Sequence, residues 1–120
     1  MGNVLVIDDE SDMLLLCRIN LPNSGIAVSC AGSGQDGLQA AFDHTPDAVV
    51  LDLMMPQMDG FEVLRRLRED QRTRDVPVVV LTAKTSQDDR DQCYLLGADA
   101  FMTKPFDPDE LTRELDSLMA

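Results

Sequence analysis

The sequence predicts an α/β fold in which helices cover a parallel sheet of five strands. Short apolar runs recur along the chain, patterns with helical spacing separate them, and the first run, VLVI, ends abruptly in acidic residues. An uninterrupted apolar run of this length is typical of a strand that is buried on both faces. Strands that alternate with helices favour a parallel sheet with right-handed crossovers, and 120 residues fit one domain, residues 1–120.

Each expected element follows from its local pattern. We expect strands at residues 4–7, 27–31, 48–51, 78–81 and 100–102. We expect helices at residues 11–21, 37–42, 60–69, 87–96 and 108–119. Three helix ends carry clear signals: Asp59 is suited to cap the third helix, Gly97 to end the fourth, and Asp107 with Pro108 to begin the last.

The charge balance is strongly acidic. Ten Lys and Arg residues oppose 22 Asp and Glu residues, which gives a formal net charge of −12. Such a domain repels phosphate backbones and anionic lipid heads, so we expect it to bind neither nucleic acid nor membranes. Its natural complement is a cation or a partner with a basic face.

The cysteines indicate a reducing environment. Cys17, Cys30 and Cys93 are widely spaced, lie in apolar stretches and form no CxxC pair. We therefore expect buried, reduced thiols in a cytoplasmic protein. The N-terminus shows no basic region before a long apolar run, and no stretch reaches membrane-spanning length, so we expect no export signal.

Chemically capable residues follow four of the five expected strands. Asp8 and Asp9 come after the first strand, Asp52 after the third, Thr82 after the fourth and Lys104 after the fifth. In a sheet of this kind the site lies outside the carboxyl ends of the strands. Each residue alone has an ordinary interpretation as a turn, a cap or a surface charge. Together, at matching strand ends, they predict one site.

The chemistry of this set favours a phosphoryl group. Close carboxylates raise the pKa of at least one of them unless a cation offsets the repulsion. Mg²⁺ suits a site with few carboxylates, and Lys104 adds a second, fixed positive charge. A carboxylate can attack phosphorus and form an aspartyl phosphate, a reaction that depends mainly on positioning and charge. We therefore expect Asp8 and Asp9 to hold Mg²⁺.

From Val4 to Met119 the chain resembles the receiver domain of two-component response regulators. The matching stretches, in order, are IDDE, DLMMPQMDG, LTAK and FMTKPF, and the four together are highly specific. The resemblance implies a doubly wound, flavodoxin-like (βα)5 fold with strand order 2-1-3-4-5. It implies that Asp52 is the phosphoacceptor and that Thr82 and Lys104 contact the phosphoryl oxygens. The implied Mg²⁺ ligands are Asp8, Asp9, Asp52 and the backbone carbonyl of Met54.

The resemblance also implies a switch formed by Thr82, Phe101 and Pro105. Phe101 occupies the aromatic switch position and has no hydroxyl, so only its packing and rotamer can change. Pro105 looks like the family's cis proline. Phosphorylation would shift a two-state equilibrium and alter the fourth helix, fifth strand and last helix, which would meet an effector domain or a second copy.

The implied phosphoryl donor is a sensor histidine kinase or a histidine phosphotransfer protein. His44 is the only histidine, and we expect it to be exposed on the side opposite the site. The chain is therefore expected to be a switch and not an enzyme, apart from promoting its own phosphotransfer and a slow autodephosphorylation. Met54 and Lys84 are expected to slow that loss by keeping water from the acyl phosphate.

Other functions compete with this interpretation. Gly32 to Gly37 satisfy G-x-G-x-x-G, but they follow the expected edge strand and Asp36 would oppose a pyrophosphate, so we interpret the glycines as turn and packing residues. A pseudo-receiver binding module would lack a site residue, and none is missing. A Mg²⁺-dependent aspartyl-phosphate phosphatase would resemble D-x-D after the first strand, and Asp52-Leu53-Met54 lacks the second Asp.

Overall fold

A computed structural model describes residues 2–120 of the chain. Within that range, five strands alternate with five α-helices, and a 3₁₀ segment, Leu21–Ser24, follows the first helix. The strands are β1 (Gly2–Ile7), β2 (Ile26–Ala31), β3 (Ala48–Leu51), β4 (Val78–Thr82) and β5 (Ala100–Thr103). The helices are α1 (Ser11–Asn20), α2 (Gly34–Asp43), α3 (Gly60–Glu69), α4 (Gln87–Leu95) and α5 (Pro108–Met119).

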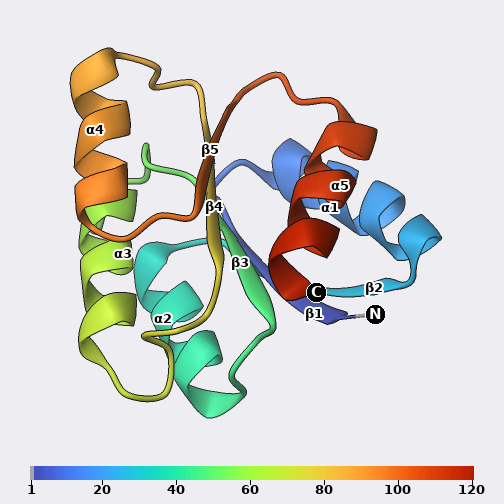
Figure 1. Cartoon of the computed structure of the whole chain (residues 1–120), viewed down its shortest axis with the longest axis horizontal. Helices are drawn as coiled ribbons and strands as arrows, with labels where there is room; N and C mark the ends of the chain where they lie inside the picture. The colour runs from blue at the N-terminus through green and yellow to red at the C-terminus, as the bar shows by residue number, and fades with distance from the viewer. Residues whose placement is uncertain (1) are drawn as a thin grey trace.

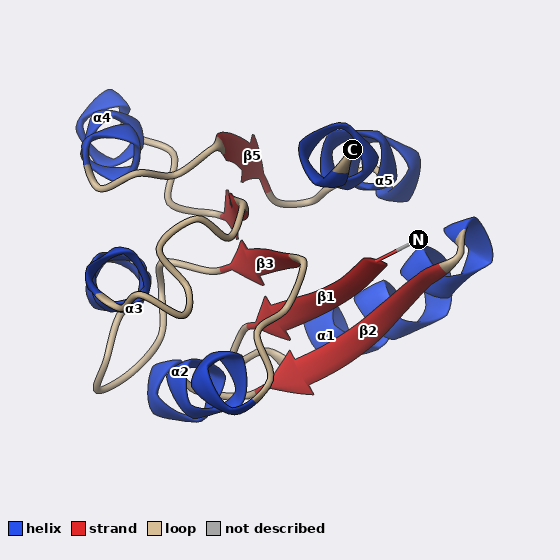
Figure 2. Cartoon of the chain, turned by 60° about the horizontal axis from the view of Figure 1, so that its bottom comes forward, coloured by secondary structure: helices blue, strands red, loops and turns tan. Residues whose placement is uncertain are grey.

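The strands form one parallel sheet in the order β2-β1-β3-β4-β5, which confirms the predicted topology. Figure 1 shows the sheet between two helical layers, with α2, α3 and α4 on one side and α1 and α5 on the other. The same three layers are visible in Figure 2 from a second direction. The strand order reverses between β1 and β3, so a crevice is expected at the carboxyl ends of these two strands.

Two apolar cores explain the uninterrupted run VLVI. Leu5 and Ile7 pack with the buried side chains of α2, α3 and α4, whereas Val4 and Val6 pack with those of α1 and α5. Successive side chains of a strand point to opposite faces of the sheet. A strand covered on both faces therefore needs apolar residues at every position.

Helix α2 begins at Gly34, three residues before the expected start at residue 37. The Ser33 hydroxyl caps the helix by accepting a hydrogen bond from the Asp36 backbone N–H at 3.1 Å. A Cβ added at Gly37 would lie 2.5 Å from Ile7 Cδ1, and one at Gly34 would lie 2.8 Å from Val63 Cγ2. These glycines allow close packing, as predicted, and they follow an edge strand of the sheet.

The three helix ends for which the sequence carries clear signals agree with the structure. The Asp59 and Asp107 carboxylates accept hydrogen bonds from backbone N–H groups in the first turns of α3 and α5. Gly97, at φ 101°, follows the last residues of α4 in the left-handed region that suits glycine. Helix α1 ends at Asn20 and not at residue 21, where the 3₁₀ segment begins with Pro22 in its first turn.

Two of the three cysteines are buried as predicted, and the third is not. Cys17 and Cys93 are fully buried, which raises the pKa of their thiols to about 12 and about 11. Cys30 is partly exposed because it lies on the edge strand β2, where its Sγ accepts a hydrogen bond from Arg18 Nε at 3.3 Å. Among residues 2–120, no helix is both long enough and apolar enough to cross a bilayer.

Candidate functional site

The site lies where β1 and β3 end side by side. The Asp8 backbone N–H donates to the Ala31 carbonyl at 3.1 Å, and the Asp52 N–H donates to the Ile7 carbonyl at 3.0 Å. These bonds continue the sheet ladder one residue past each strand. They fix Asp8 and Asp52 next to each other at the sheet edge, and both side chains are only 3% exposed.

Lys104 follows β5 and reaches back to these carboxylates. Its Nζ donates to Asp8 Oδ2 at 2.8 Å, to Glu10 Oε1 at 2.7 Å and to Asp52 Oδ2 at 3.2 Å. The Lys104 backbone N–H also donates to the Thr82 carbonyl at 2.9 Å, which ties the residue to the end of β4. The peptide bond between Lys104 and Pro105 is cis.

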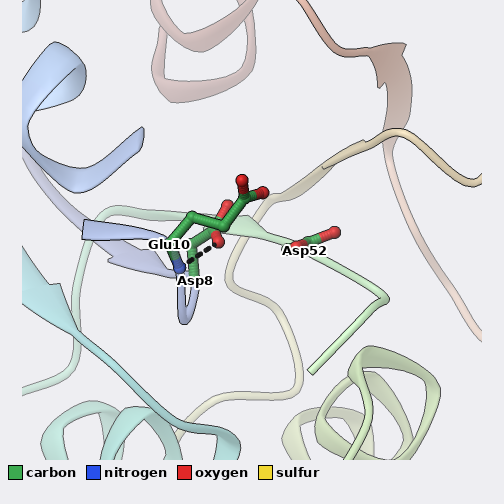
Figure 3. A group of neighbouring side chains, drawn as sticks. All are labelled: Asp8, Glu10 and Asp52. Carbon is green, nitrogen blue, oxygen red and sulfur yellow. Dashed lines mark hydrogen bonds between the residues drawn. The ribbon is translucent and has the colours of Figure 1, made fainter. Parts of the chain in front are cut away.

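Asp8, Glu10 and Asp52 form a carboxylate cluster, and the sequence interpretation did not include Glu10 in it. Ligand oxygens of Asp8, Glu10 and Asp52 all lie within 4.8 Å of one another, and Figure 3 shows these side chains together. Glu10 is the N-cap residue of α1 without a side-chain capping bond, so its carboxylate is free to meet Lys104. Asp9 is exposed and is not part of the group found among residues 2–120. The acidic run Asp8-Asp9-Glu10 was the available signal for Glu10.

Burial and charge shift the protonation equilibria of the site. Burial raises the pKa of Asp8 above its ordinary 3.8, and the nearby Asp52 charge adds to the rise, while hydrogen bonds from Lys104 and the Glu10 N–H oppose it. Burial alone would lower the pKa of Lys104. The hydrogen bonds to Asp8 and Glu10, with the charges of Asp8 and Asp52, raise it above the usual value instead. The Lys104 ammonium therefore stays protonated, and its positive charge offsets part of the negative charge of the carboxylates.

Thr82 is the last residue of β4 and not the first residue after it. Its side chain is fully buried, and its hydroxyl accepts a hydrogen bond from the Lys84 backbone N–H at 3.1 Å. The Lys84 ammonium lies 3.2 Å from Asp89 Oδ2 in the first turn of α4. Lys84 therefore pairs with Asp89 and not with a member of the carboxylate cluster.

The loop between β3 and α3 packs tightly against Asp52. The Met54 backbone N–H donates to Asp52 Oδ1 at 3.2 Å, whereas the Met54 side chain is exposed. The Gly60 N–H donates to the Leu53 carbonyl at 3.0 Å, which places the start of α3 against the chain that carries Asp52. A Cβ at Gly60 would overlap the Asp52 carbonyl oxygen and lie 2.7 Å from Leu53 Cα. The glycine in DLMMPQMDG thus permits this approach.

Replacing Gly60 by Ala is expected to destabilise the protein by about 1–3 kcal/mol, because the added methyl group meets rigid backbone. Urea unfolding measures the change. Gly32→Ala is the matched control, since no atom of residues 2–120 outside its own neighbourhood lies within 4 Å of a Cβ at that glycine. Equal stability of the two variants would contradict the packing role of Gly60.

Two further residues lie as expected from the sequence. Phe101, on β5, is partly buried against the core beside α2, α3 and α4, and the Arg90 guanidinium of α4 stacks over its ring at 4.7 Å from the centroid. His44 is exposed and follows α2, four residues before β3 begins. It therefore lies at the edge of the sheet opposite the carboxyl ends.

The sheet order and the acidic, lysine-bound strand ends define a doubly wound α/β fold with a site at its switch point, and known proteins identify its family. Residues 4–116 match the family described as "Response regulator receiver domain". This chain belongs to the response regulator receiver family, as the resemblance predicted.

Several curated relatives are transcriptional regulators. The chain is 42% identical over 119 residues to the DNA-binding dual master transcriptional regulator RpaA of Synechocystis sp., covering 99% of this chain and 49% of that protein. It is 46% identical over 112 residues to the transcriptional regulatory protein KdpE of Mycobacterium tuberculosis, covering 93% and 48%. The chain thus spans about half the length of the curated relatives it matches.

Solved structures share the whole fold. The chemotaxis protein CheY4 of Vibrio cholerae superimposes with a TM-score of 0.92 at 29% identity, over 98% of both chains. The receiver domain of the sensor histidine kinase PA1611 of Pseudomonas aeruginosa gives 0.90 at 28% identity, over 98% of this chain and 97% of that one. The PA1611 structure contains a magnesium ion coordinated in its active site cleft.

Proposed function

We propose that the chain is a phosphorylation-dependent switch that accepts a phosphoryl group on Asp52. The observation that carries the proposal is the placement of Asp52, which is buried beside Asp8 and bonded to the Lys104 ammonium. A carboxylate oxygen of Asp52 attacks phosphorus of a phosphohistidine, the phosphorus–nitrogen bond breaks, and the imidazole, which already carries a proton on its other ring nitrogen, leaves as a neutral ring. The negative charge on the phosphoryl oxygens is met by Lys104 and, after a side-chain movement, by the Thr82 hydroxyl.

The donor set fits Mg²⁺. Asp8 and Asp52 offer buried carboxylate oxygens, and burial holds the pKa of Asp8 above its ordinary value although Lys104 donates a hydrogen bond to it. The ion would be held directly by Asp9, Asp52 and the Met54 carbonyl, and directly or through a water by Asp8. When bound, the ion would offset charge between the carboxylates and the phosphoryl oxygens.

Incubation with acetyl phosphate and Mg²⁺, followed by intact mass measurement, tests this proposal. A stable gain of one phosphoryl group that needs Mg²⁺ supports the receiver switch. Turnover of acetyl phosphate without accumulation would favour a phosphatase, and no change in mass would favour a pseudo-receiver.

We also propose slow autodephosphorylation. The exposed Met54 thioether accepts hydrogen bonds only weakly, so it holds no attacking water in line with the acyl phosphate. Lys84 would have to leave Asp89 before it could cover the phosphoryl group. The decay of phosphorylated protein after removal of the donor measures the lifetime.

The proposed output surface consists of α4, β5 and α5, with Phe101 as the switch residue. A Thr82 hydroxyl that turns to the phosphoryl group gives up the Lys84 N–H and leaves space for Phe101. The rotation of Phe101 into that space also breaks its stacking contact with Arg90. This contact favours the unphosphorylated arrangement by about 0.5–1 kcal/mol.

Phe101→Ala is therefore expected to leave phosphorylation intact and to weaken phosphate-dependent self-association or partner binding. Analytical ultracentrifugation with and without phosphoryl donor measures the self-association. Unchanged phosphate dependence in the variant would show that Phe101 is only a core residue.

The proposed partners and location follow from the same function. The donor is a sensor histidine kinase or a histidine phosphotransfer protein, and the effector is a domain of the kind that the transcriptional regulators above carry. A cytoplasmic location is supported by the inert, buried Cys17 and Cys93 thiols.

A further inference from the structure

Glu10 is the solvent-facing member of the carboxylate cluster. Its side chain is 63% exposed, against 3% for Asp8 and for Asp52. Figure 3 shows Asp8 and Glu10 on one loop and Asp52 across from them. Glu10 and Lys104 also line a hollow of about 610 Å³ between the start of α1 and the start of α5. Glu10 therefore stands at the mouth of the site, on the open side of the ammonium.

The Lys104 ammonium has no hydrogen left for an incoming group. An ammonium carries three N–H donors, and Lys104 directs hydrogen bonds to Asp8, Glu10 and Asp52. A phosphoryl oxygen can therefore bind Lys104 only after one carboxylate gives way. A buried carboxylate that loses its partner costs much free energy, whereas water can replace the ammonium at an exposed one. Of the three carboxylates, the exposed Glu10 is therefore released at the lowest cost.

We propose that Glu10 selects among phosphoryl donors, an inference that rests on the proposed function of Asp52. Glu10 occupies Lys104 and repels anions at the mouth of the site, so it slows small anionic donors that bring no positive charge. A donor protein with Lys or Arg beside its phosphohistidine pairs with the released Glu10 carboxylate and avoids this cost. Glu10 thereby favours protein-borne phosphohistidine over free acyl phosphates.

Glu10→Gln is expected to raise the phosphorylation rate with acetyl phosphate about fivefold, which corresponds to about 1 kcal/mol for one exposed charge at contact distance. The gain is expected to shrink as salt rises, because salt screens an exposed charge. With a phosphorylated histidine phosphotransfer protein that carries Arg or Lys beside its histidine, the rate is expected to stay unchanged or to fall. The ratio of the two rates is the quantity that the inference predicts.

Asp12→Asn is the matched control. Asp12 is an exposed carboxylate that lines the same hollow and makes no hydrogen bond to Lys104. The substitution Asp12→Asn therefore removes the same charge without freeing the Lys104 ammonium. Equal acceleration by Asp12→Asn and Glu10→Gln would overturn the role of Glu10. Slower acetyl phosphate labelling by Glu10→Gln, together with weaker Mg²⁺ binding in calorimetry, would overturn it in favour of metal binding.

Binding of beryllofluoride, an anionic phosphoryl mimic, gives a readout that does not depend on reaction. Its affinity, followed by NMR in the presence of Mg²⁺, is expected to rise about fivefold in Glu10→Gln and to change little in Asp12→Asn. Equal affinity of wild type and Glu10→Gln would overturn the inference. If wild type neither binds beryllofluoride nor gains a phosphoryl group, the proposed function itself fails.

Discussion

Asp52→Asn is expected to abolish labelling by a phosphorylated histidine protein and by acetyl phosphate, while the fold is retained. The amide has nearly the same shape, and its oxygen can still accept the hydrogen bond from the Met54 N–H. It cannot serve as the nucleophile of an acyl phosphate. Radiolabel transfer measures the loss, and circular dichroism checks the fold.

The matched control for this variant is Asp9→Asn, which removes one exposed charge nearby and leaves the buried carboxylates in place. It is expected to keep Asp52 as the labelled residue, at a lower rate because Asp9 is a proposed Mg²⁺ ligand. Labelling of Asp52→Asn at the wild-type rate would refute the assignment of the phosphoacceptor.

Asp8→Asn is expected to stabilise the metal-free protein, by on the order of 1 kcal/mol, and to lose Mg²⁺-dependent phosphorylation. Asp8 is buried beside Asp52, and its raised pKa means that its ionised form is less favourable in the folded protein than in the unfolded chain. The neutral amide removes that cost, and its single oxygen can still accept a hydrogen bond from either the Glu10 N–H or the Lys104 ammonium. Urea unfolding in the presence of a chelator measures the gain.

The gain from Asp8→Asn is expected to depend on pH. Since the folded-state pKa of Asp8 lies above the ordinary 3.8, the folded wild type binds a proton first as the pH falls from 7. The stability of the wild type then rises relative to that of the variant. The difference in unfolding free energy vanishes once the pH lies below the ordinary pKa of Asp, 3.8. A difference that stays constant between neutral pH and pH 3.8, or a variant that is less stable than wild type at pH 7, would contradict the account.

Sequence patterns predicted the sheet because both faces of every central strand are buried. Runs such as VLVI at residues 4–7 and AVVL at residues 48–51 have few alternatives to a parallel strand between two helical layers. The positions of Asp8, Asp52 and Lys104 followed from the same topology, since parallel strands end at one edge. Helix α2 was predicted too short because Gly34 and Gly37 resemble loop residues until their packing against Val63 and Ile7 is known.

Side-chain direction was the part that the sequence did not decide. In the run Asp8-Asp9-Glu10, the last ladder bond turns Asp8 into the site, while Asp9 is left exposed and Glu10 meets Lys104. The stacking of Arg90 on Phe101 likewise depends on how α4 packs beside β5. Contacts of this kind join residues far apart in the chain or depend on the path of one loop, and no local pattern encodes them.

Chemical trapping identifies the residue that receives the phosphoryl group, which we propose to be Asp52. The protein is phosphorylated with acetyl phosphate and Mg²⁺ and then treated with borohydride, which reduces an acyl phosphate of aspartate to homoserine. Peptide mapping by tandem mass spectrometry then locates the reduced residue. We expect homoserine at position 52 and at no other carboxylate. Homoserine at position 8 or 9, or a reduced glutamate at position 10, with Asp52 unmodified, would contradict it.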